Sequence, residues 1–444
     1  MARTKEQILD LIQAAGVVGA GGAGFPTHVK LNSSPEYVIA NCAECEPLIR
    51  SDKYLMEMHA DEFVDGMRAA LDATGAQYGV LAVKEKNHAA VDALERACAD
   101  DPQITVHLLE NYYPAGDEQQ IIYEVTGRVI PVGQLPISVG CVVINAQTLR
   151  HVSQAVRGVP VISRNVTVCG EVASPVTLEV PIGTAVDYLI ELAGGSLLAD
   201  PAVIIGGPLM GRVTFDIAHE FVTKTTNGVI VLPKDHPLID KKNSDFDRQY
   251  RIARSACCQC NYCTLICPRS HLGLGVQPHK IMQALTLNRA EVLTDGLSAL
   301  GCCNCGLCTY VGCNMGLTPN RFIYAVRADL LKKKVKTDKQ PAPVNKMRDL
   351  VKAPTHRVIQ RAGIAAYDVE VPFLSEYRPP AAVRIMLRQH IGAACVPTVA
   401  RDDRVTCGQC IGAPPEGALG ARVHASISGT VIAVTEDYID IMDI

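Results

Sequence analysis

The sequence predicts an α/β protein built from several domains. Three observations lead to this class. The chain has 444 residues, 48% of them hydrophobic; strand-like and helix-like segments alternate over its first third; and one cysteine pattern occurs twice. A chain of this length usually holds about two to four domains, each with a core of its own.

The N-terminal segment MARTKEQILDLIQAAGVVG is too polar for a signal peptide and predicts an amphipathic helix, with Ile8, Leu11, Ile12 and Ala15 on one face. No run of about twenty apolar residues occurs, so we expect no membrane span. The net charge of -4 argues against nucleic acid as a partner. Together these features predict a cytoplasmic protein, where eighteen cysteines are more often ligands or redox groups than disulfides.

A glycine-rich segment, GVVGAGGAGFPTHVKL, follows the first helix and ends at Leu31. No strand precedes it, so it does not fit the dinucleotide-binding G-x-G-x-x-G pattern. Its bare backbone N–H groups could nevertheless bind a phosphate, and Lys30 could add a positive charge. A flexible turn is the alternative, but a turn rarely needs four closely spaced glycines, here Gly19, Gly21, Gly22 and Gly24.

Alternating segments then predict a parallel sheet covered by helices. We expect strands at residues 38–40, 78–85 and 104–110, and helices at 61–75, 87–101 and within 112–127. Ligands of such sheets bind beyond the carboxyl ends of the strands. The loops from Asn41 to Glu46 and from Tyr113 to Glu118 lie there, so we expect their acidic side chains to face a ligand; solvated or helix-capping carboxylates are the alternative.

Two cysteine runs, ACCQCNYCTLICPRS and GCCNCGLCTYVGCNM, begin at Ala256 and Gly301. The first run has the C-x2-C-x2-C-x3-C-P spacing of bacterial [4Fe–4S] ligation, in which the fourth cysteine binds the other cluster. In the second run the fourth cysteine comes one residue later than expected. This spacing predicts two clusters, one held by Cys257, Cys260, Cys263 and Cys313 and the other by Cys302, Cys305, Cys308 and Cys267.

Zinc is the alternative metal, but four-cysteine zinc sites usually use two C-x2-C pairs separated by a longer loop. Cys258 and Cys303 remain unassigned, and we expect them to be small buried residues.

The remaining segments predict smaller units. Residues 165–195 indicate strand, turn, strand and helix, with Cys169 in the core, and residues 336–380 indicate a partly extended connector. Short strands and Gly/Pro turns predict a small C-terminal sandwich or barrel. Its Cys407-Gly-Gln-Cys410 sequence is expected to be a structural thiol pair, with a redox pair or a third metal site as alternatives.

Several motifs resemble known families. GAGGAGFPTHVKL, NCAECEP, YPAGDEQQI and LPISVGCVVINAQT resemble the flavin- and NADH-binding domain shared by the RnfC protein of the Rnf complex and the flavoprotein subunit of respiratory complex I. IGGPLMG followed by the cysteine runs is closer to the RnfC protein. A segment that precedes the flavin domain in that protein, resembling VRIMLRQHIGAACVPTVARDDRVTCGQCIG, is C-terminal here. This order resembles the cobalamin reductases of the propanediol-utilisation microcompartment.

The resemblance implies a flavin-binding α/β domain (1–160), a β-grasp domain (161–240), a helical two-[4Fe–4S] ferredoxin-like domain (245–335), a linker (336–380) and a barrel or sandwich-hybrid domain (381–444). It implies Glu44 and Glu118 as catalytic candidates. It also implies, with our own assignment of the Tyr113 loop, a cofactor site formed by Gly19, Gly21, Gly22, Gly24, Phe25, Lys30, Asn41, Glu44, Tyr113, Gly116, Asp117, Glu118 and Asn145. Asp117 departs from the family, which has Glu there. The C-terminal HASISG lacks the lysine that a swinging cofactor arm would need.

The implied activity is transfer of electrons from NADH through FMN and two [4Fe–4S] clusters to cobalamin, reducing cob(III)alamin to cob(II)alamin and then cob(I)alamin. Cobalamin or a cobalamin adenosyltransferase would be the acceptor. A microcompartment shell or its enzymes are further candidate partners, and the location would be the cytoplasm or the compartment lumen. Two alternatives stay open: an NADH-linked module serving a ferredoxin, a flavodoxin or a membrane complex, and a flavin-free iron–sulfur relay.

Overall fold

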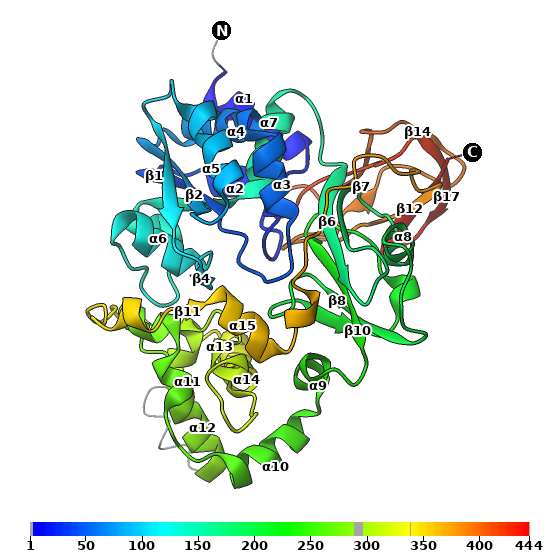
Figure 1. Ribbon diagram of the computed structural model, residues 1–444. Helices are drawn as coiled ribbons and strands as arrows, with labels where there is room; N and C mark the ends of the chain where they lie inside the picture. Colours follow the sequence, from blue (N-terminus) through cyan, green and yellow to red (C-terminus); the bar gives the residue numbers. More distant parts are fainter. Residues whose placement is uncertain (1–2, 288–295, 338, 444) are drawn as a thin grey trace.

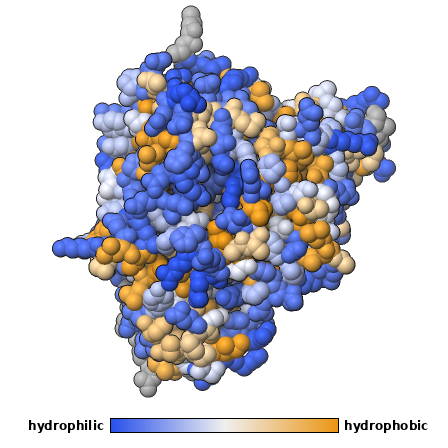
Figure 2. All heavy atoms as spheres, viewed as in Figure 1, coloured by the Kyte–Doolittle hydropathy of each residue, from blue (hydrophilic) through white to orange (hydrophobic). Residues whose placement is uncertain are grey.

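The chain forms a series of regions that follow one another in sequence and pack side by side (Figure 1). The computed structural model describes residues 3–287, 296–337 and 339–443. Within these residues no helix is both long and apolar enough to cross a membrane. Hydrophilic side chains cover most of the face drawn in Figure 2, with apolar side chains scattered between them.

The first region is a parallel four-stranded sheet in the order β3-β2-β1-β5. The strands are β1 (Tyr37–Cys42), β2 (Tyr78–Lys84), β3 (Ile104–Leu109) and β5 (Cys141–Asn145). The helices are α1 (Lys5–Ala14), α2 (Thr27–Leu31), α3 (Ser51–Met58), α4 (Ala60–Thr74), α5 (His88–Cys98), α6 (Glu118–Thr126) and α7 (Ala146–Val156), with a 3-10 turn at Pro136–Val139. The alternation of strands and helices in the sequence therefore produces the predicted layered sheet.

Alternating side chains of the strands fill two cores. Val38 and Ala40 face a core with α1, α4, α5 and α7, whereas Ile39 faces a core on the other side of the sheet with α6. Because parallel strands end at the same edge, the end of β1 and the end of β5 lie next to each other, with Asn41 paired in register with Asn145. This edge is where the predicted loops begin.

The second region is a five-stranded mixed sheet in the order β7-β6-β10-β8-β9, with one helix. Its elements are β6 (Ser163–Gly170), β7 (Val176–Pro181), α8 (Val186–Leu192), β8 (Pro201–Ile205), β9 (Arg212–Thr214), a 3-10 turn at Ile217–His219 and β10 (Gly228–Pro233). Cys169 is fully buried, as predicted.

The third region is helical and carries both cysteine runs. It contains α9 (Pro237–Asn243), α10 (Phe246–Ala256), α11 (Tyr262–Leu265), a π-helical turn (Ser270–Leu274), α12 (Pro278–Leu287), a 3-10 turn (Gly296–Gly301), α13 (Leu307–Tyr310) and α14 (Pro319–Lys332). The helices α11 and α13 are single turns that follow the first cysteines of each run, and they lie against each other.

The segment expected to be a partly extended connector, residues 336–380, also contains short regular elements that the sequence did not predict. It contains a 3-10 turn (Arg348–Leu350), β11 (Ala353–Pro354), α15 (Thr355–Ala362) and a 3-10 turn (Ala365–Tyr367). β11 pairs with β4 (Tyr112–Tyr113), and Val358 of α15 is fully buried. The segment was assigned as a connector from its Lys- and Pro-rich ends, but an amphipathic helix between these ends packs between the first and third regions (Figure 1).

The C-terminal region consists of two small sheets, in the orders β12-β18-β17-β14 and β13-β15-β16. The strands are β12 (Ala382–Met386), β13 (Val396–Pro397), β14 (Arg404–Val405), β15 (Cys410–Ala413), β16 (Val423–His424), β17 (Gly429–Val434) and β18 (Tyr438–Met442). Its buried residues, such as Ile385 and Leu387, belong to the same continuous apolar cluster as the core beneath α1, α4 and α7. The C-terminal region is therefore packed onto the first region.

Candidate functional site

A cavity of about 470 Å³ opens at the carboxyl edge of the first sheet. All thirteen residues that the sequence analysis proposed for the cofactor line this one cavity: Gly19, Gly21, Gly22, Gly24, Phe25, Lys30, Asn41, Glu44, Tyr113, Gly116, Asp117, Glu118 and Asn145. Its size lies within the usual range for small-molecule and cofactor sites.

The glycine loop is closed by backbone hydrogen bonds and held close to the sheet. The Gly19 N–H donates to the Phe25 carbonyl at 2.9 Å, and the loop approaches Asn145 so closely that a Cβ on Gly21 would lie 2.9 Å from Asn145 Nδ2. A Cβ on Gly22 would meet nothing within 4 Å, so the backbone there faces open space. Lys30 donates from Nζ to the Val143 carbonyl at 2.9 Å, which fixes its position beside the cavity.

The C-terminal region and the second region both form hydrogen bonds with the glycine-rich segment. The Ile391 N–H donates to the Gly24 carbonyl at 3.2 Å. The buried Lys224 of the second region donates from Nζ to the carbonyls of Gly16 and Arg422, both at 2.6 Å. The glycine loop is thus held by contacts with two later regions of the chain.

Glu44 lies at the N-terminus of α3. Its carboxylate accepts the backbone N–H groups of Asp52 at 2.6 Å and Lys53 at 3.2 Å. Its backbone is left-handed, with φ of 37°, an uncommon conformation for a residue other than glycine that is found at functional sites. Burial, and then the nearby Asp52 carboxylate, raise the pKa of Glu44 to about 8. Glu44 therefore both caps a helix and holds a titratable carboxyl group at the cavity.

Glu46 joins three regions of the chain. Its Oε2 accepts the N–H groups of Leu209 at 2.8 Å and Met210 at 3.2 Å, and its Oε1 lies 2.9 Å from the Tyr113 hydroxyl. The same hydroxyl lies 2.9 Å from the Cys305 carbonyl. Burial raises the pKa of Glu46. Glu46 thereby connects the sheet edge with the IGGPLMG loop and the second cysteine run.

The Gly116–Glu118 turn forms the opposite wall. Asn41 donates from Nδ2 to the Gly116 carbonyl at 2.8 Å, and a Cβ on Gly116 would lie 2.9 Å from Asn41 Oδ1, so only glycine fits. Asp117 forms a bidentate ion pair with Arg269, at 2.6 and 2.7 Å, and both side chains are largely buried. The Asp117 carboxylate therefore binds the segment beside Cys267.

Glu118 begins α6 and has no side-chain hydrogen bond within the described part of the chain. Burial raises its pKa, an effect opposed by the charge of Lys30. Asn145 donates to Asp52 Oδ2 at 3.2 Å, whereas its Oδ1 is buried without a partner. An acceptor left unpaired at a cavity wall would be satisfied by a ligand with an N–H donor, such as the flavin ring. The residues present therefore fit a flavin.

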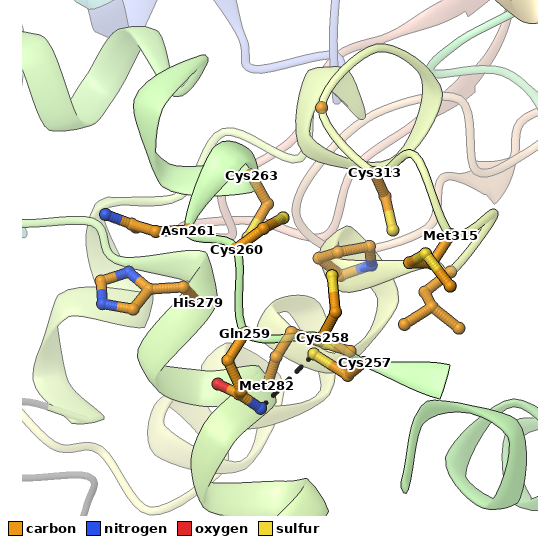
Figure 3. A pocket seen from close by; sticks show the side chains of 13 residues that line it. Cys257, Cys258, Gln259, Cys260, Asn261, Cys263, His279, Met282, Cys313 and Met315 are labelled. Atoms are coloured by element: carbon orange, nitrogen blue, oxygen red, sulfur yellow. Dashed lines mark hydrogen bonds between the residues drawn. The ribbon is translucent and has the colours of Figure 1, made fainter. Parts of the chain in front are cut away.

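The first predicted cluster set surrounds a small cavity in the helical region. Cys257, Cys260, Cys263 and Cys313 line it together with Cys258, Gln259 and Met315. Figure 3 shows that these cysteines come from two segments and face a common space, with Gln259 donating to Cys257 Sγ. The structure thus brings Cys313, despite its longer spacing, to the three cysteines of the first run.

The second predicted set surrounds a neighbouring cavity. It is lined by Cys302, Cys305, Cys308 and Cys267, together with Cys303. Cys303 and Cys305 also line the large cavity, so the two sites share a wall. A group bound in the large cavity would lie next to this second set.

Among the described residues, no three His, Cys, Asp or Glu side chains form a compact group that could hold one metal ion. The assignment of the two [4Fe–4S] sites rests on the cysteine spacing and on the two cysteine-lined cavities.

The two unassigned cysteines of these runs differ from the expectation of burial. Cys258 is exposed although it lines the first cysteine cavity, and Cys303 is only partly buried. In the C-terminal region, the Cys407 and Cys410 thiols contact the carbonyls of Ser426 and Gly412.

The sequence analysis did not assign ten other lining residues to this cavity: Ala23, Cys45, Ile49, Asp52, Pro114, Val143, Met210, Asn227, Cys303 and Cys305. Glu46 also lines it and lies in the loop whose acidic side chains were expected to face a ligand. Asp52 follows that loop, so the acidic character of residues 44–52 was a usable signal. The sequence around Met210 and Asn227 contains no pattern that predicts a place in this cavity. Both residues line it because the second region packs against the first.

Family models match the chain in four places. They are the Nuo51 FMN-binding domain (residues 12–154), the SLBB domain (165–213), the 4Fe-4S dicluster domain (256–318) and the RnfC barrel sandwich hybrid domain (370–442). These matches confirm the predicted fold class and identify an FMN-binding domain and a dicluster domain in this chain.

Among solved structures, an NAD+-reducing [NiFe]-hydrogenase in the H2-reduced state aligns with a TM-score of 0.47 and 23% identity, covering 78% of this chain and 65% of that one.

Curated relatives resemble the chain over its full length. The cobalamin reductase PduS of Salmonella typhimurium is 41% identical, and the alignment covers 100% of this chain and 98% of the relative. The cobalamin reductase PduS of Citrobacter freundii is 39% identical, with 98% of this chain and 96% of the relative covered. A component of the Na(+)-translocating ferredoxin:NAD(+) oxidoreductase complex of Acetobacterium woodii is 34% identical over 59% of this chain and 58% of its own. With full-length identity at this level, the chain belongs to the cobalamin reductase PduS family.

Proposed function

We propose that this protein is an NADH-dependent reductase that passes electrons through FMN and two [4Fe–4S] clusters to cobalamin, from cob(III)alamin to cob(II)alamin and cob(I)alamin. Such reduction would support regeneration of adenosylcobalamin. One observation carries the proposal: the cavity lined by the thirteen proposed cofactor residues shares Cys303 and Cys305 with the second cysteine site. The name of the full-length relatives supports cobalamin as the acceptor.

Each part of the cavity has a role in this proposal. The backbone of Gly19, Gly21, Gly22 and Gly24, with Lys30 beside it, would hold the phosphate, because N–H groups and an ammonium suit an anion. Asn41, Tyr113, Gly116 and Asn145 would position the ring, and Phe25 would contact the nicotinamide. FMN held by these residues would supply two-electron acceptance from a nicotinamide and one-electron release to iron–sulfur clusters.

Two carboxyl groups are the candidates for handling protons. Glu44 and Glu118 both line the cavity, and burial raises the pKa of each. A carboxyl group with a raised pKa can hold a proton near neutral pH, as a general acid or base must. We therefore assign the catalytic role to Glu44 and Glu118.

The test is an anaerobic preparation of the protein. Extracted flavin should be FMN, and iron and sulfide should each approach about eight per chain, as two cubanes require. NADH should bleach the flavin absorbance, and the spectrum of added cob(III)alamin should convert to that of cob(II)alamin and then cob(I)alamin. NADPH in place of NADH tests the choice of donor. A colourless, zinc-containing protein would contradict the proposal, and protein with clusters but no flavin would favour the relay alternative.

A second function has some support. The chain is 34% identical over part of its length to a component of the Acetobacterium woodii ferredoxin:NAD(+) oxidoreductase complex. An NADH-linked module serving a ferredoxin, a flavodoxin or a membrane complex is therefore the alternative. Fast flavin oxidation by those proteins, with no cobalamin reduction, would favour it.

The remaining partners and the location follow from the first proposal. A cobalamin adenosyltransferase could receive the product directly, and shell proteins or enzymes of a microcompartment could hold the reductase in the lumen or leave it in the cytoplasm. Co-purification of tagged protein with isolated compartments distinguishes these locations.

A further inference from the structure

The two cysteine sites differ in their contact with solvent. In the second set, Cys267, Cys305 and Cys308 are at most 9% exposed, and the set adjoins the large cavity. In the first run, Cys258 and Cys260 are exposed, and this site shares no lining residue with the large cavity. The first site therefore faces outward, and the second lies between it and the cavity.

The two sites also adjoin each other. Gly312 lies between them, and a Cβ at this position would come within 3.1 Å of Cys263 Cα and 3.2 Å of Cys308 Cα. Cavity, second set and first set thus form a continuous series that ends at the protein surface. An outside partner that exchanges electrons with the chain can approach the first set most closely.

The helical region that carries this outward site is basic. Residues 245–335 contain eleven Lys and Arg and five Asp and Glu, which gives this region a net charge of +6. The whole chain has a net charge of -4, so the rest of the chain has a net charge of -10. A positive region on a negative protein attracts a negatively charged partner and orients it toward that region.

Four basic residues flank the first site on two sides. Arg251 and Arg254 are exposed near the end of α10, which stops one residue before Cys257, and neither forms an ion pair within the described residues. On the other side, Arg361 lies 3.5 Å from the Asn314 side chain, and Lys241 is within electrostatic range of Arg361 and Cys313.

Of the three acidic residues on α9, α10 and the turn between them, two interact with Arg248 and the third lies at a helix N-terminus. Asp240 lies 3.7 Å from Arg248, and Asp245 accepts the Arg248 backbone N–H at 2.7 Å as the cap of α10. Asp247 lies in the first turn of the same helix, where the helix dipole favours a negative charge. Met315, which lines the first site, is 49% exposed and adds apolar surface there.

We propose that the basic rim formed by Arg251, Arg254, Lys241 and Arg361 is the docking surface for an acidic protein that takes electrons from the cluster at Cys257, Cys260, Cys263 and Cys313. The inference rests on the proposed function for the source of the electrons. Each NADH oxidised supplies two electrons and releases one proton, so two one-electron acceptors are reduced per NADH. The acceptor is a group carried by the acidic protein, and the rim holds that protein over the outward cluster.

The experiment compares two double substitutions with the same change of charge. Arg251→Glu/Arg254→Glu alters the rim, and Arg401→Glu/Arg404→Glu alters exposed arginines in the distant C-terminal region (Figure 1). Binding of an acidic flavodoxin and of a basic cytochrome c to the anaerobic holoprotein is measured by fluorescence anisotropy. Iron content and circular dichroism verify that each variant is intact.

At low salt we expect the rim variant to bind flavodoxin about tenfold more weakly than wild type, since steering by focused charge changes association by tenfold or more. The matched variant should bind like wild type, and high salt should remove the difference because exposed charges are screened. Cytochrome c should bind wild type more weakly than flavodoxin does. Equal weakening in both variants, unchanged binding in the rim variant, or tighter binding of cytochrome c would each overturn the proposal.

A separate measurement distinguishes failure of the docking proposal from failure of the proposed NADH reductase function. NADH is added to the wild type alone, and bleaching of the flavin is followed. Absence of bleaching would refute the NADH reductase, whereas the docking surface is judged from the binding constants. Equal reduction of protein-free cobalamin by wild type and both variants, with no flavodoxin binding, would count against an acidic protein partner.

Discussion

Substitution of Glu46 tests how far the large cavity depends on contacts between separate regions. Glu46→Ala removes the acceptor for the Leu209 and Met210 N–H groups and one of two oxygens beside the Tyr113 hydroxyl. Glu46→Gln keeps an oxygen for the two N–H groups. The Tyr113 hydroxyl can donate its proton to the Cys305 carbonyl at 2.9 Å. Its oxygen is then free to accept a hydrogen bond from the side-chain amide of the Glu46→Gln variant.

The contacts set the expected magnitudes. Leu209 is buried, so its unsatisfied N–H costs about 1–3 kcal/mol in the alanine variant, while the exposed Met210 can turn to water. Loss of a charge-assisted bond at Tyr113 adds about 1 kcal/mol, and relief of a buried carboxylate offsets part of the total. We expect a net loss of about 2 kcal/mol for Glu46→Ala and less than about 1 kcal/mol for Glu46→Gln.

The assay combines urea unfolding of apoprotein with FMN titration followed by flavin fluorescence. Since Tyr113 and Met210 line the cavity, Glu46→Ala should also weaken FMN binding by about tenfold, the equivalent of about 1.4 kcal/mol. Glu46→Gln should bind FMN within about threefold of wild type. Equal losses in the two variants would show that charge, and not the hydrogen-bond geometry, holds the regions together; no loss in either would refute the reasoning.

Three further predictions concern the clusters, the interface and pH. Cys313→Ser should reduce iron from about eight to about four per chain, whereas Cys258→Ser should leave it unchanged; equal iron in both would contradict the crossed ligand sets. Asp117→Asn should destabilise the holoprotein by about 3 kcal/mol in thermal unfolding, because it leaves the buried Arg269 without a countercharge; a neutral effect would refute this role. The raised pKa of Glu44 means that the native state binds a proton that the unfolded chain, with a pKa near 4.5, releases. The stabilisation that comes from this bound proton is fully present below about pH 4.5. It is lost as the pH rises toward about 8, and the free energy of unfolding then falls by up to about 1.4 kcal/mol per pH unit. The urea midpoint of apoprotein should therefore be higher at the acidic end of this window, and Glu44→Gln should flatten the dependence.

The sequence was most informative where the chemistry is local. The spacing of Cys257, Cys260 and Cys263 and the density of glycines from Gly19 to Gly24 each lie within one short segment, so the ligand type can be inferred without knowledge of packing. Periodicity predicted the alternating sheet for the same reason, because an element's burial pattern repeats along its own residues. The ligand sets themselves remain predictions until the iron is measured.

The sequence failed where burial depends on a distant partner. The connector was expected to be partly extended and no helix was predicted in it; α15 forms because Val358 and Ile359 are buried against the first and third regions. Cys258 was expected to be buried but is exposed, because spacing gives no information on which side of a loop meets solvent.

By itself, the sequence determined which groups this protein has: a glycine loop, an acidic sheet edge and two cysteine runs in a fixed order. Only the tertiary structure decided how they adjoin, with Cys303 and Cys305 against the cavity, Cys258 and Cys260 at the surface, and Glu46 joining three regions. The physical reason is that motif spacing fixes distances of a few residues, whereas contacts between regions arise from packing of surfaces that are hundreds of residues apart in the chain.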